Sequence, residues 1–499
     1  MDRRSFLTRS LALSTAALLP GRVFANDTKS RFAEALRHNP ALLAYRSAAA
    51  DSFDSQARLT GSVPAGLEGT LFRNGPARHE IGDFRYGHWF DGDGMLQAFR
   101  LTPDGIRHQA RMIQTRKYQA EQAAGRALYP GFASVPPNPA PVTSADTVNS
   151  GNISVLPHGG NLYALWEAGS AWRMNPDTLE TEGLQVFSPE SQGLPFSAHP
   201  RVEPDGTLWN FGYVSAAHLI VLWHIAADGR LKNIGTVPCD PISMPHDFVV
   251  TERHIVILIP PFEYENRGGA TFLDAHTWHP ERPTRVMLVD KNDFSRVRWL
   301  ELPAQWVFHF GNAWEDKAGV IRFDGARAID PMVMIDSFRA IMSGAPSTPT
   351  HSRHHLYRID TRSGSATETP MFTDSLDTEF PVIDPRVSCR HNSRLLMLSS
   401  DPHSDARDGV LNCVSLYDAA MDRLSTFRYP ASVIPEEHLF VPEPGSAPES
   451  SGWIIGSSLN CATARTEFRI FDVNNLTGGP LVTAELPYAL PLGLHGKFI

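Results

Sequence analysis

Short runs of alternating apolar and polar residues recur along this chain, and each ends in residues typical of turns. Seven of these runs are EGTLFRNGP, GNLYALWEAG, DGTLWNFGYV, ERHIVILIPP, AGVIRFDGAR, NSRLLMLSSD and SGWIIGSSLN. A second run follows each of them and ends in polar residues where a hairpin would turn, as in AFRLTPDG, AWRMNPDTLE, LWHIAADGRL, VMLVDKNDFS, LYRIDTRSGS, VSLYDAAMDR and FRIFDVNNLT. Such alternation is typical of half-buried strands. The pattern therefore predicts seven pairs of adjacent strands.

This repeat predicts an all-β fold, because clear helical periodicity is confined to residues 29–38 and 121–128. Many short strands with Gly and Pro turns are typical of a sandwich, a barrel or a propeller. A repeat count of seven favours a seven-bladed β-propeller. The repeats are unevenly spaced, which indicates inserted loops at 119–150, 262–282 and 323–352. We expect these loops and short helices to form a dome over one end of the propeller axis.

The first residues predict an exported protein. The pair Arg3 and Arg4 precedes a short apolar stretch that ends in small residues at Ala25, as in a twin-arginine-type signal peptide. We assign the signal to residues 1–25 and expect a periplasmic location; the alternative is a cytosolic protein with an apolar first helix. Residues 26–499 are predicted to form a single propeller domain, with a lead-in segment at 26–60. No other apolar stretch is long enough to predict a transmembrane helix.

Composition narrows the classes of partner. The net charge of −9 leaves no basic excess to neutralise phosphates, which argues against nucleic acid. The four cysteines form no CxxC pair, which argues against a zinc or iron–sulfur knuckle. They form either one or two disulfides or four buried thiols. We expect a monomer or a weak oligomer.

Three of the twenty histidines share one place in the repeat. His199, His246 and His309 each precede the first run of their unit by about ten residues. In a propeller, that segment is the innermost strand of the blade, which lines the central channel. Equivalent positions on successive blades point at one axis. The three histidines are therefore a candidate metal site.

The last ten residues, LPLGLHGKFI, contain a fourth histidine, His495. The first unit of the repeat has no innermost strand before it. If the tail supplies that strand, the ring closes and His495 joins the other three; the alternative is a frayed strand with an incidental histidine. Four neutral imidazoles suit Fe, Zn, Cu or Ni, and two open octahedral positions would favour Fe(2+) for binding O2.

Three glutamates lie in apolar, strand-rich surroundings: Glu167, Glu379 and Glu437. A carboxylate in such a place is costly unless it is paired. Metal-binding histidines usually donate their other ring N–H to an acceptor, often a carboxylate. We expect the three glutamates to be these acceptors, although each could form a buried ion pair with an arginine.

These segments resemble the carotenoid cleavage oxygenase family. The resemblance rests on GTLFRNGP, HWFDGDGM, AHPRVEPDGTLWNFGY, MPHDFVVTERHIVIL, FHFGNAWE, EFPVIDPR and GLHGKFI, which run from about residue 60 to the end in family order. It implies an axial iron held by the four histidines, with the three glutamates behind them. It also implies a dioxygenase that cleaves one conjugated C=C bond of a carotenoid or apocarotenoid with O2, giving two aldehydes. No catalytic group is implied beyond the metal centre.

The family also contains enzymes that cleave stilbenoids, which is our alternative for the substrate. A phenol would favour a polar contact, for which Tyr86 and Lys117 are candidates. Ile153 aligns with a family position that partly occludes an open site on the iron. A membrane-dissolved carotenoid would favour peripheral membrane contact through an apolar patch such as YPGFASVPP. Further alternatives are a non-catalytic, metal-stabilised propeller binding module and an isomerase or hydrolase on the same scaffold.

Overall fold

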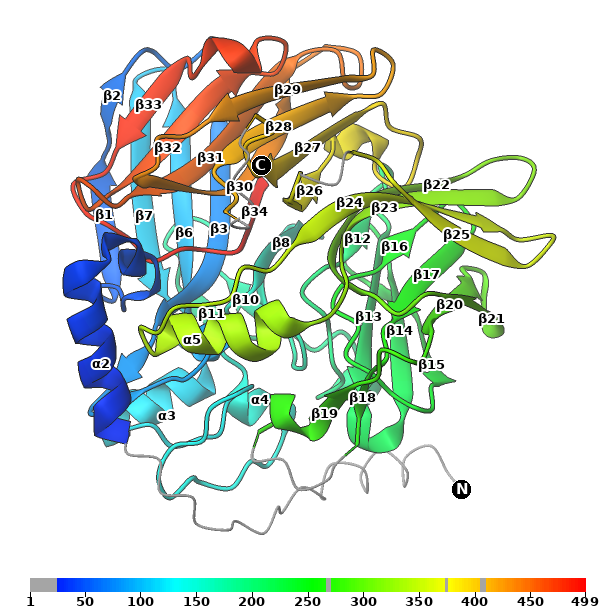
Figure 1. Ribbon diagram of the computed structural model, residues 1–499, viewed down its shortest axis with the longest axis horizontal. Helices are drawn as coiled ribbons and strands as arrows, with labels where there is room; N and C mark the ends of the chain where they lie inside the picture. The colour runs from blue at the N-terminus through cyan, green and yellow to red at the C-terminus, as the bar shows by residue number, and fades with distance from the viewer. Residues whose placement is uncertain (1–24, 266–270, 373–375, 404–409) are drawn as a thin grey trace.

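A computed structural model shows seven antiparallel sheets arranged around a central axis (Figure 1). The structure describes residues 25–265, 271–372, 376–403 and 410–499. The predicted seven-bladed propeller is therefore confirmed. The predicted signal peptide lies outside the described residues except for Ala25, so export stays a prediction.

The seven sheets are numbered here as blades, with strands given from the axis outward. Blade 1 contains β34 (His495–Phe498), β3 (Gly69–Arg78), β6 (Asp93–Thr102), β7 (Gly105–Met112) and β1 (Ser52–Gln56). Blade 2 contains β8 (Ser154–His158), β9 (Asn161–Leu165), β10 (Trp172–Met174) and β11 (Thr181–Leu184). Blade 3 contains β12 (Arg201–Val202), β13 (Leu208–Val214), β14 (Leu219–Ile225) and β15 (Leu231–Pro238). Blade 4 contains β16 (Val249–Val250), β17 (His254–Ile259), β20 (Thr284–Asp290) and β21 (Asp293–Leu302).

Blades 5 to 7 complete the ring. Blade 5 contains β22 (Trp306–Glu315), β23 (Val320–Ala328), β24 (Ser352–Asp360) and β25 (Ser365–Pro370). Blade 6 contains β26 (Thr378–Val382), β27 (Arg394–Ser399), β28 (Cys413–Asp418) and β29 (Arg423–Arg428). Blade 7 contains β30 (Val433–Pro442), β31 (Gly452–Asn460), β32 (Arg465–Asp472), β33 (Val482–Glu485) and β2 (Arg58–Thr60).

The two predicted runs of each unit are the second and third strands of a blade. These strands are the most buried because each blade packs between two others: β17, with the sequence HIVILI, buries five of its six residues. Apolar residues on both faces then leave little alternation, as expected for strands covered on both sides. The outer strands, such as β15 and β21, alternate more and are more exposed.

The ring is closed by strands from both ends of the described chain. At the inner edge, β34 pairs antiparallel with β3, with His495 opposite Asn74 and Phe498 opposite Leu71. At the outer edge, β2 pairs with β33 of blade 7. The tail approaches blade 1 closely, because a Cβ atom on Gly75 would lie 2.4 Å from the Cα of Gly493. The prediction that the C-terminal segment supplies the missing innermost strand is confirmed.

Helices and the inserted loops gather on one side of the ring (Figure 1). The helical elements are α2 (Ala25–His38), α3 (Arg116–Ala124), α4 (Ala145–Val148), α5 (Phe338–Met342), a single π-helical turn η6 (Val333–Ser337), and the short 3₁₀ turns η1 (Pro40–Tyr45), η2 (Trp89–Asp91), η3 (Pro189–Ser191), η4 (Ser215–Ala217), η5 (Leu273–Ala275), η7 (Pro385–Val387) and η8 (Leu476–Gly478). Two small hairpins, β4 (Glu80–Ile81) with β5 (Phe84–Arg85) and β18 (Phe262–Tyr264) with β19 (His276–Trp278), complete the described elements.

The helices and insertions differ in detail from the prediction. Helix α3 begins earlier than residue 121, because Thr115 caps its first turn, and it ends at Gly125, which adopts a left-handed conformation with φ of 63°. The third insertion covers 329–351 and not 323–352, because residues 323–328 complete β23. The predicted lead-in segment contains β1 and β2, which are outer strands of blades 1 and 7.

All four cysteines are buried free thiols, which decides between the two alternatives left by the sequence. No helix within the described residues is long and apolar enough to cross a membrane.

Candidate metal centre

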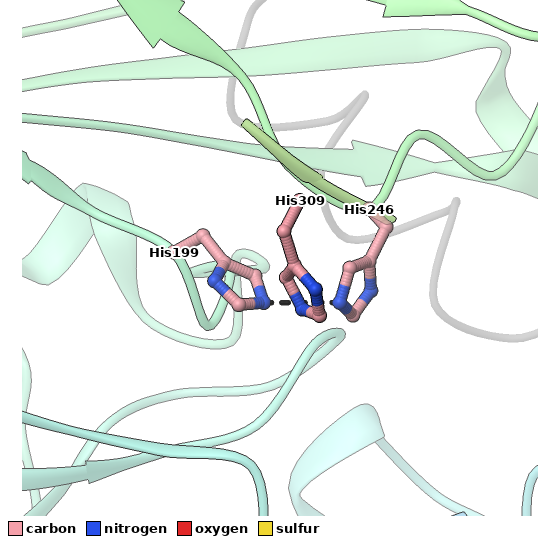
Figure 2. A group of neighbouring side chains, drawn as sticks. All are labelled: His199, His246 and His309. Carbon is pink, nitrogen blue, oxygen red and sulfur yellow. Dashed lines mark hydrogen bonds between the residues drawn. The ribbon is translucent and has the colours of Figure 1, made fainter. Parts of the chain in front are cut away.

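The structure brings His199, His246, His309 and His495 together at the propeller axis. The Nε2 atoms of His199 and His246 are 3.0 Å apart. The ring of His199 lies 5.2 Å from that of His309 and 4.7 Å from that of His495. The rings of His309 and His495 are also 4.7 Å apart. Figure 2 shows three of these imidazoles pointing toward one another.

The four histidines come from the inner ends of four blades. His309 lies within β22, and His495 is the first residue of β34. His199 and His246 lie just before β12 and β16, which are only two residues long. The position of the histidines within the sequence repeat therefore predicted their place at the axis, although His199 and His246 lie just before the inner strand and not within it.

Three carboxylates face the outer nitrogens of three of these rings. Nδ1 of His309 lies 2.7 Å from Glu379, and Nδ1 of His495 lies 2.9 Å from Glu437. Nδ1 of His246 lies 2.7 Å from Glu167, at an ion-pair distance but outside the angle of a good hydrogen bond. A carboxylate at Nδ1 favours the tautomer with its proton on Nδ1 and leaves the Nε2 lone pair free to bind a cation.

Backbone irregularities occur at these residues, and the strand pattern did not predict them. The ladder register shifts in β22 around His309, in β26 beside Glu379 and in β30 around Glu437. A β-bulge redirects a side chain and is common next to active sites. The residue after Glu379, Phe380, has a φ of 54°, which is strained for a bulky side chain. Its ring stacks on His309 at 5.1 Å.

Burial and charge set the protonation of the histidines. Burial, followed by the other three histidines, lowers the pKa of His199 well below its ordinary value. Burial also lowers the pKa of His495, although Glu437 opposes it. At His309 burial acts in the same direction, but Glu379 outweighs it and raises the pKa. A metal ion would therefore meet two neutral rings and would compete with a proton at His309.

The donor set fits a divalent transition metal. Nε2 of His309 is buried and has no hydrogen-bond partner, although a buried polar nitrogen normally has one. Nε2 atoms of the neighbouring rings face the same space, and neutral imidazoles suit Fe, Zn, Cu and Ni. The backbone of Ile153 adjoins the centre, since its carbonyl accepts a hydrogen bond from His495 N at 3.4 Å.

A row of aromatic rings extends from the centre into the insertions. Phe308 contacts His246 at 5.1 Å, and Phe90 lies 6.4 Å from Phe308. Phe90 in turn contacts Phe132 and Phe338 at 6.1 and 5.2 Å. Phe132 and Phe338 belong to the first and third insertions, while Phe272 of the second lies 6.0 Å from Phe132. The sequence offered no means to choose these rings among 27 phenylalanines.

The two residues proposed as a phenol contact lie side by side in a buried cluster. Nζ of Lys117 donates to the Tyr86 hydroxyl at 2.6 Å, to Asp93 at 2.8 Å and to Glu121 at 2.9 Å. Tyr86 donates to Glu121 at 2.7 Å, and burial raises its pKa well above the ordinary value. All four side chains are buried, so the pair is internal to the fold and each Lys117 N–H has a partner.

Comparison with known families assigns the chain. The family described as retinal pigment epithelial membrane protein matches residues 47–499. The chain belongs to the carotenoid cleavage oxygenase family. The resemblance inferred from the sequence motifs is thereby confirmed, and members of this carotenoid cleavage oxygenase family are metal-dependent oxygenases.

Characterised members of the family share most of their length with this chain. The chain is 29% identical to apocarotenoid-15,15'-oxygenase of Synechocystis over 88% of its length and 91% of that enzyme. It is 30% identical to lignostilbene-alpha,beta-dioxygenase isozyme III of Sphingomonas paucimobilis over 88% and 92% of the two chains. Cobalt-substituted Synechocystis apocarotenoid oxygenase superposes with a TM-score of 0.82 at 26% identity, covering 92% of this chain and 99% of the other.

Proposed function

We propose that this oxygenase holds Fe(2+) through its four histidines and cleaves one conjugated C=C bond of a carotenoid or apocarotenoid with O2. Each carbon of the broken double bond takes one oxygen atom, so one alkene and one O2 give two aldehydes. The observation that carries the proposal is the convergence of four imidazoles beside an aromatic row. Iron(II), when bound, supplies the redox chemistry that allows O2 to react with an alkene.

The residues of the chain then have separate tasks. The four imidazoles hold the ion without adding charge, and Glu167, Glu379 and Glu437 orient three of them. Phe308 and Phe90 provide an apolar surface next to the centre, which suits a polyene and excludes water. The insertions place further rings along the same row. Orientation of one double bond against the oxygen is the main contribution expected of the protein.

A hydroxylated stilbene is the second candidate substrate. The observation that favours it is the 2.6 Å contact between Lys117 and the Tyr86 hydroxyl, the pair expected to bind a phenol. Because each N–H of Lys117 has a partner inside the cluster, a phenol would have to replace one of these contacts. A polyene bound along the row of aromatic rings would not have to replace any hydrogen bond, and we therefore propose a carotenoid or apocarotenoid as the first candidate substrate.

Labelled oxygen tests the proposed reaction. Iron-loaded protein incubated with an apocarotenal, a carotenoid or a hydroxystilbene under 18O2 is expected to yield two aldehydes, each carrying one labelled atom by rapid mass analysis. A parallel reaction in labelled water under unlabelled O2 controls for exchange of aldehyde oxygen. Products without label from O2 would exclude oxygenase chemistry and favour an isomerase or hydrolase. Absence of product with all three substrates would favour the non-catalytic binding module.

The Tyr86→Phe substitution tests the second candidate. The variant keeps the ring and removes only the hydroxyl that bonds to Lys117 and Glu121. If this hydroxyl binds a phenol, kcat/KM for a hydroxystilbene falls about tenfold or more relative to that for an apocarotenal, because a buried polar partner is lost. We expect the apocarotenal value to change less than about twofold. An unchanged ratio would leave the cluster with a structural role and remove the support for a stilbenoid.

A further inference from the structure

One arginine connects the backbones around three of the four histidines. Arg201 lies two residues after His199, at the start of β12. Its Nε donates to the carbonyl of Phe248 at 2.9 Å, and its Nη1 donates to the carbonyl of Gly311 at 3.1 Å. Its Nη2 also donates to the carbonyl of Phe310 at 3.1 Å. One guanidinium on blade 3 therefore bonds to the inner ends of blades 4 and 5.

Asp247 completes this connection. Its Oδ2 accepts from Nη2 of Arg201 at 2.6 Å and from the backbone N–H of Phe310 at 2.8 Å. Its Oδ1 accepts from the N–H of Phe248 at 2.7 Å. The side chain of Asp247 is 2% exposed and that of Arg201 is 21% exposed, so the pair lies mostly inside the ring, where its hydrogen bonds compensate for desolvation.

Every one of these contacts falls next to a histidine of the centre. Asp247 and Phe248 follow His246 by one and two residues, and Phe310 and Gly311 follow His309 in the same way. One residue of extended chain spans about 3.3 Å, so the contacted backbone groups lie only one or two such steps from the histidines. A shift of these backbone groups would therefore move the imidazoles as well. Arg201 itself is equally close to His199. The guanidinium thus links the three backbone segments that carry these imidazole rings.

The sheets alone hold two of these segments weakly. The ladder that joins β12 to β13 contains two residue pairs, and so does the ladder between β16 and β17. By contrast, β3 and β6 pair over most of their length. His199 and His246 therefore stand at inner edges with few backbone bonds of their own. The contacts of Arg201 supply restraint where the ladders are shortest.

We propose that Arg201 is a positioning residue of the metal centre: it sets the spacing of His199, His246 and His309 by joining their three blades. This inference rests on the proposed binding of a metal by these histidines. A lysine could not replace it, because a single ammonium lacks the planar fork that reaches three carbonyls and a carboxylate at once. We expect Asp247 to act with it as the shared acceptor.

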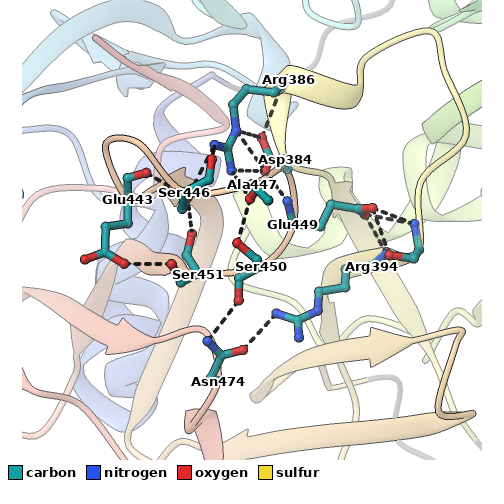
Figure 3. Close-up of polar contacts among 11 residues, drawn as sticks. Asp384, Arg386, Arg394, Glu443, Ser446, Ala447, Glu449, Ser450, Ser451 and Asn474 are labelled. Carbon is teal, nitrogen blue, oxygen red and sulfur yellow. Dashed lines mark hydrogen bonds and ion pairs between the residues drawn. The ribbon is translucent and has the colours of Figure 1, made fainter.

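The chain offers a matched control in Arg386. This arginine pairs with Asp384 at 2.6 Å and donates to the carbonyls of Ser446 and Ala447 at 2.7 and 3.2 Å. It joins the loop after β26 to the loop after β30, as Figure 3 shows. Its side chain is 29% exposed, which is close to the value for Arg201. None of its partners lies within two residues of the four histidines or their glutamates.

The experiment compares Arg201→Met, Arg201→Lys and Arg386→Met with the unaltered protein. Each protein is titrated with Fe(II) under anaerobic conditions, and each is loaded with Co(II), whose visible absorption reports ligand geometry. Both Arg201 variants are expected to bind Fe(II) about tenfold to a hundredfold more weakly and to shift the cobalt spectrum. Arg386→Met is expected to lower the melting temperature of the metal-free protein while retaining the affinity and the spectrum.

Two results would overturn the inference, and one would overturn its basis. Arg201→Met with unchanged iron affinity and cobalt spectrum would show that the guanidinium does not position the ligands. Equal losses in Arg386→Met would assign the effect to general destabilisation. If the unaltered protein bound neither metal, the proposed metal centre itself would be wrong. Should Arg201→Met fail to fold, Arg201→Lys carries the same test, since it keeps the charge and the aliphatic stem.

Discussion

A chain that ends at Leu494 is expected to lose both its metal and a large part of its stability. The deletion removes β34, so β3 loses its inner partner and becomes the exposed edge of blade 1. It also removes Phe498, which packs against the core shared by blades 1 and 7. Loss of a fully buried phenylalanine costs roughly 3–5 kcal/mol, and loss of the half-buried Phe498 is expected to cost less. His495, the fourth imidazole, is lost in the same step.

His495→Asn separates the two effects of the deletion. An asparagine amide can donate to Glu437 as the ring Nδ1 does, but it offers nothing in place of Nε2. We expect this variant to bind Fe(II) roughly a thousandfold more weakly, equivalent to about 4 kcal/mol, because one of the four proposed ligands is gone. Its metal-free form should unfold within about 1 kcal/mol of the unaltered protein, since β34 still pairs with β3.

Metal content after gel filtration and urea unfolding of the metal-free proteins measure these outcomes. The unaltered chain is expected to retain both iron and the stability that the pairing of β34 with β3 provides. His495→Asn is expected to keep only that stability, and the deleted chain is expected to keep neither. Retention of iron by the deleted chain would contradict the assignment of His495. Equal destabilisation in the two variants would contradict the account in which closure depends on β34 and metal binding on the imidazole.

Acid is expected to unfold the metal-free protein steeply, because several histidines are buried in neutral form. Burial lowers the pKa of His88, His108 and His438 from 6.5 to about 3. In the unfolded chain each takes up a proton as the pH falls below about 6.5, whereas the folded protein does not. Their contribution to stability is complete above that pH and is lost progressively toward about pH 3. Each adds about 1.4 kcal/mol per pH unit to the slope.

The His108→Gln variant isolates one of these contributions. His108 lies between Tyr488 and Gln97 with no link to the metal centre, so its loss does not change the ligands. The slope of the unfolding free energy against pH, measured by urea titration between about pH 6 and pH 4, should fall by about 1.4 kcal/mol per unit. His38→Gln, at a side chain that is 76% exposed, is the control for replacing a histidine outside the core. Equal slopes for all three proteins would show that His108 titrates normally in the folded state.

The sequence was informative where the fold repeats. The paired runs identified the second and third strands of all seven blades, because these strands are largely buried between neighbouring blades and are rich in apolar residues. The same repeat placed three histidines at equivalent inner positions. The missing innermost strand of the first unit located His495, although it is separated from its neighbour His309 by most of the last three blades.

Features that depend on contacts between blades were not predictable in this way. The bulges at His309 and Glu437 and the left-handed Phe380 have no local signal, since each results from how an inner strand meets its neighbours. The bonds of Arg201 join residues 47 and 110 positions apart. Nor could the sequence show that Tyr86 and Lys117 share their donors with two carboxylates, because neither the HWFDGDGM segment around Asp93 nor the helical segment around Glu121 indicates which side chains it meets.

Anomalous diffraction at the iron absorption edge, from crystals of the Fe(II)-loaded protein, tests the central claim most directly. That claim is that four histidines from four blades, including His495, bind one metal ion. The expected result is a single strong peak on the propeller axis, within bonding distance of Nε2 of His199, His246, His309 and His495. A crystal with no peak there, or with an ion that His495 does not contact, would contradict the claim.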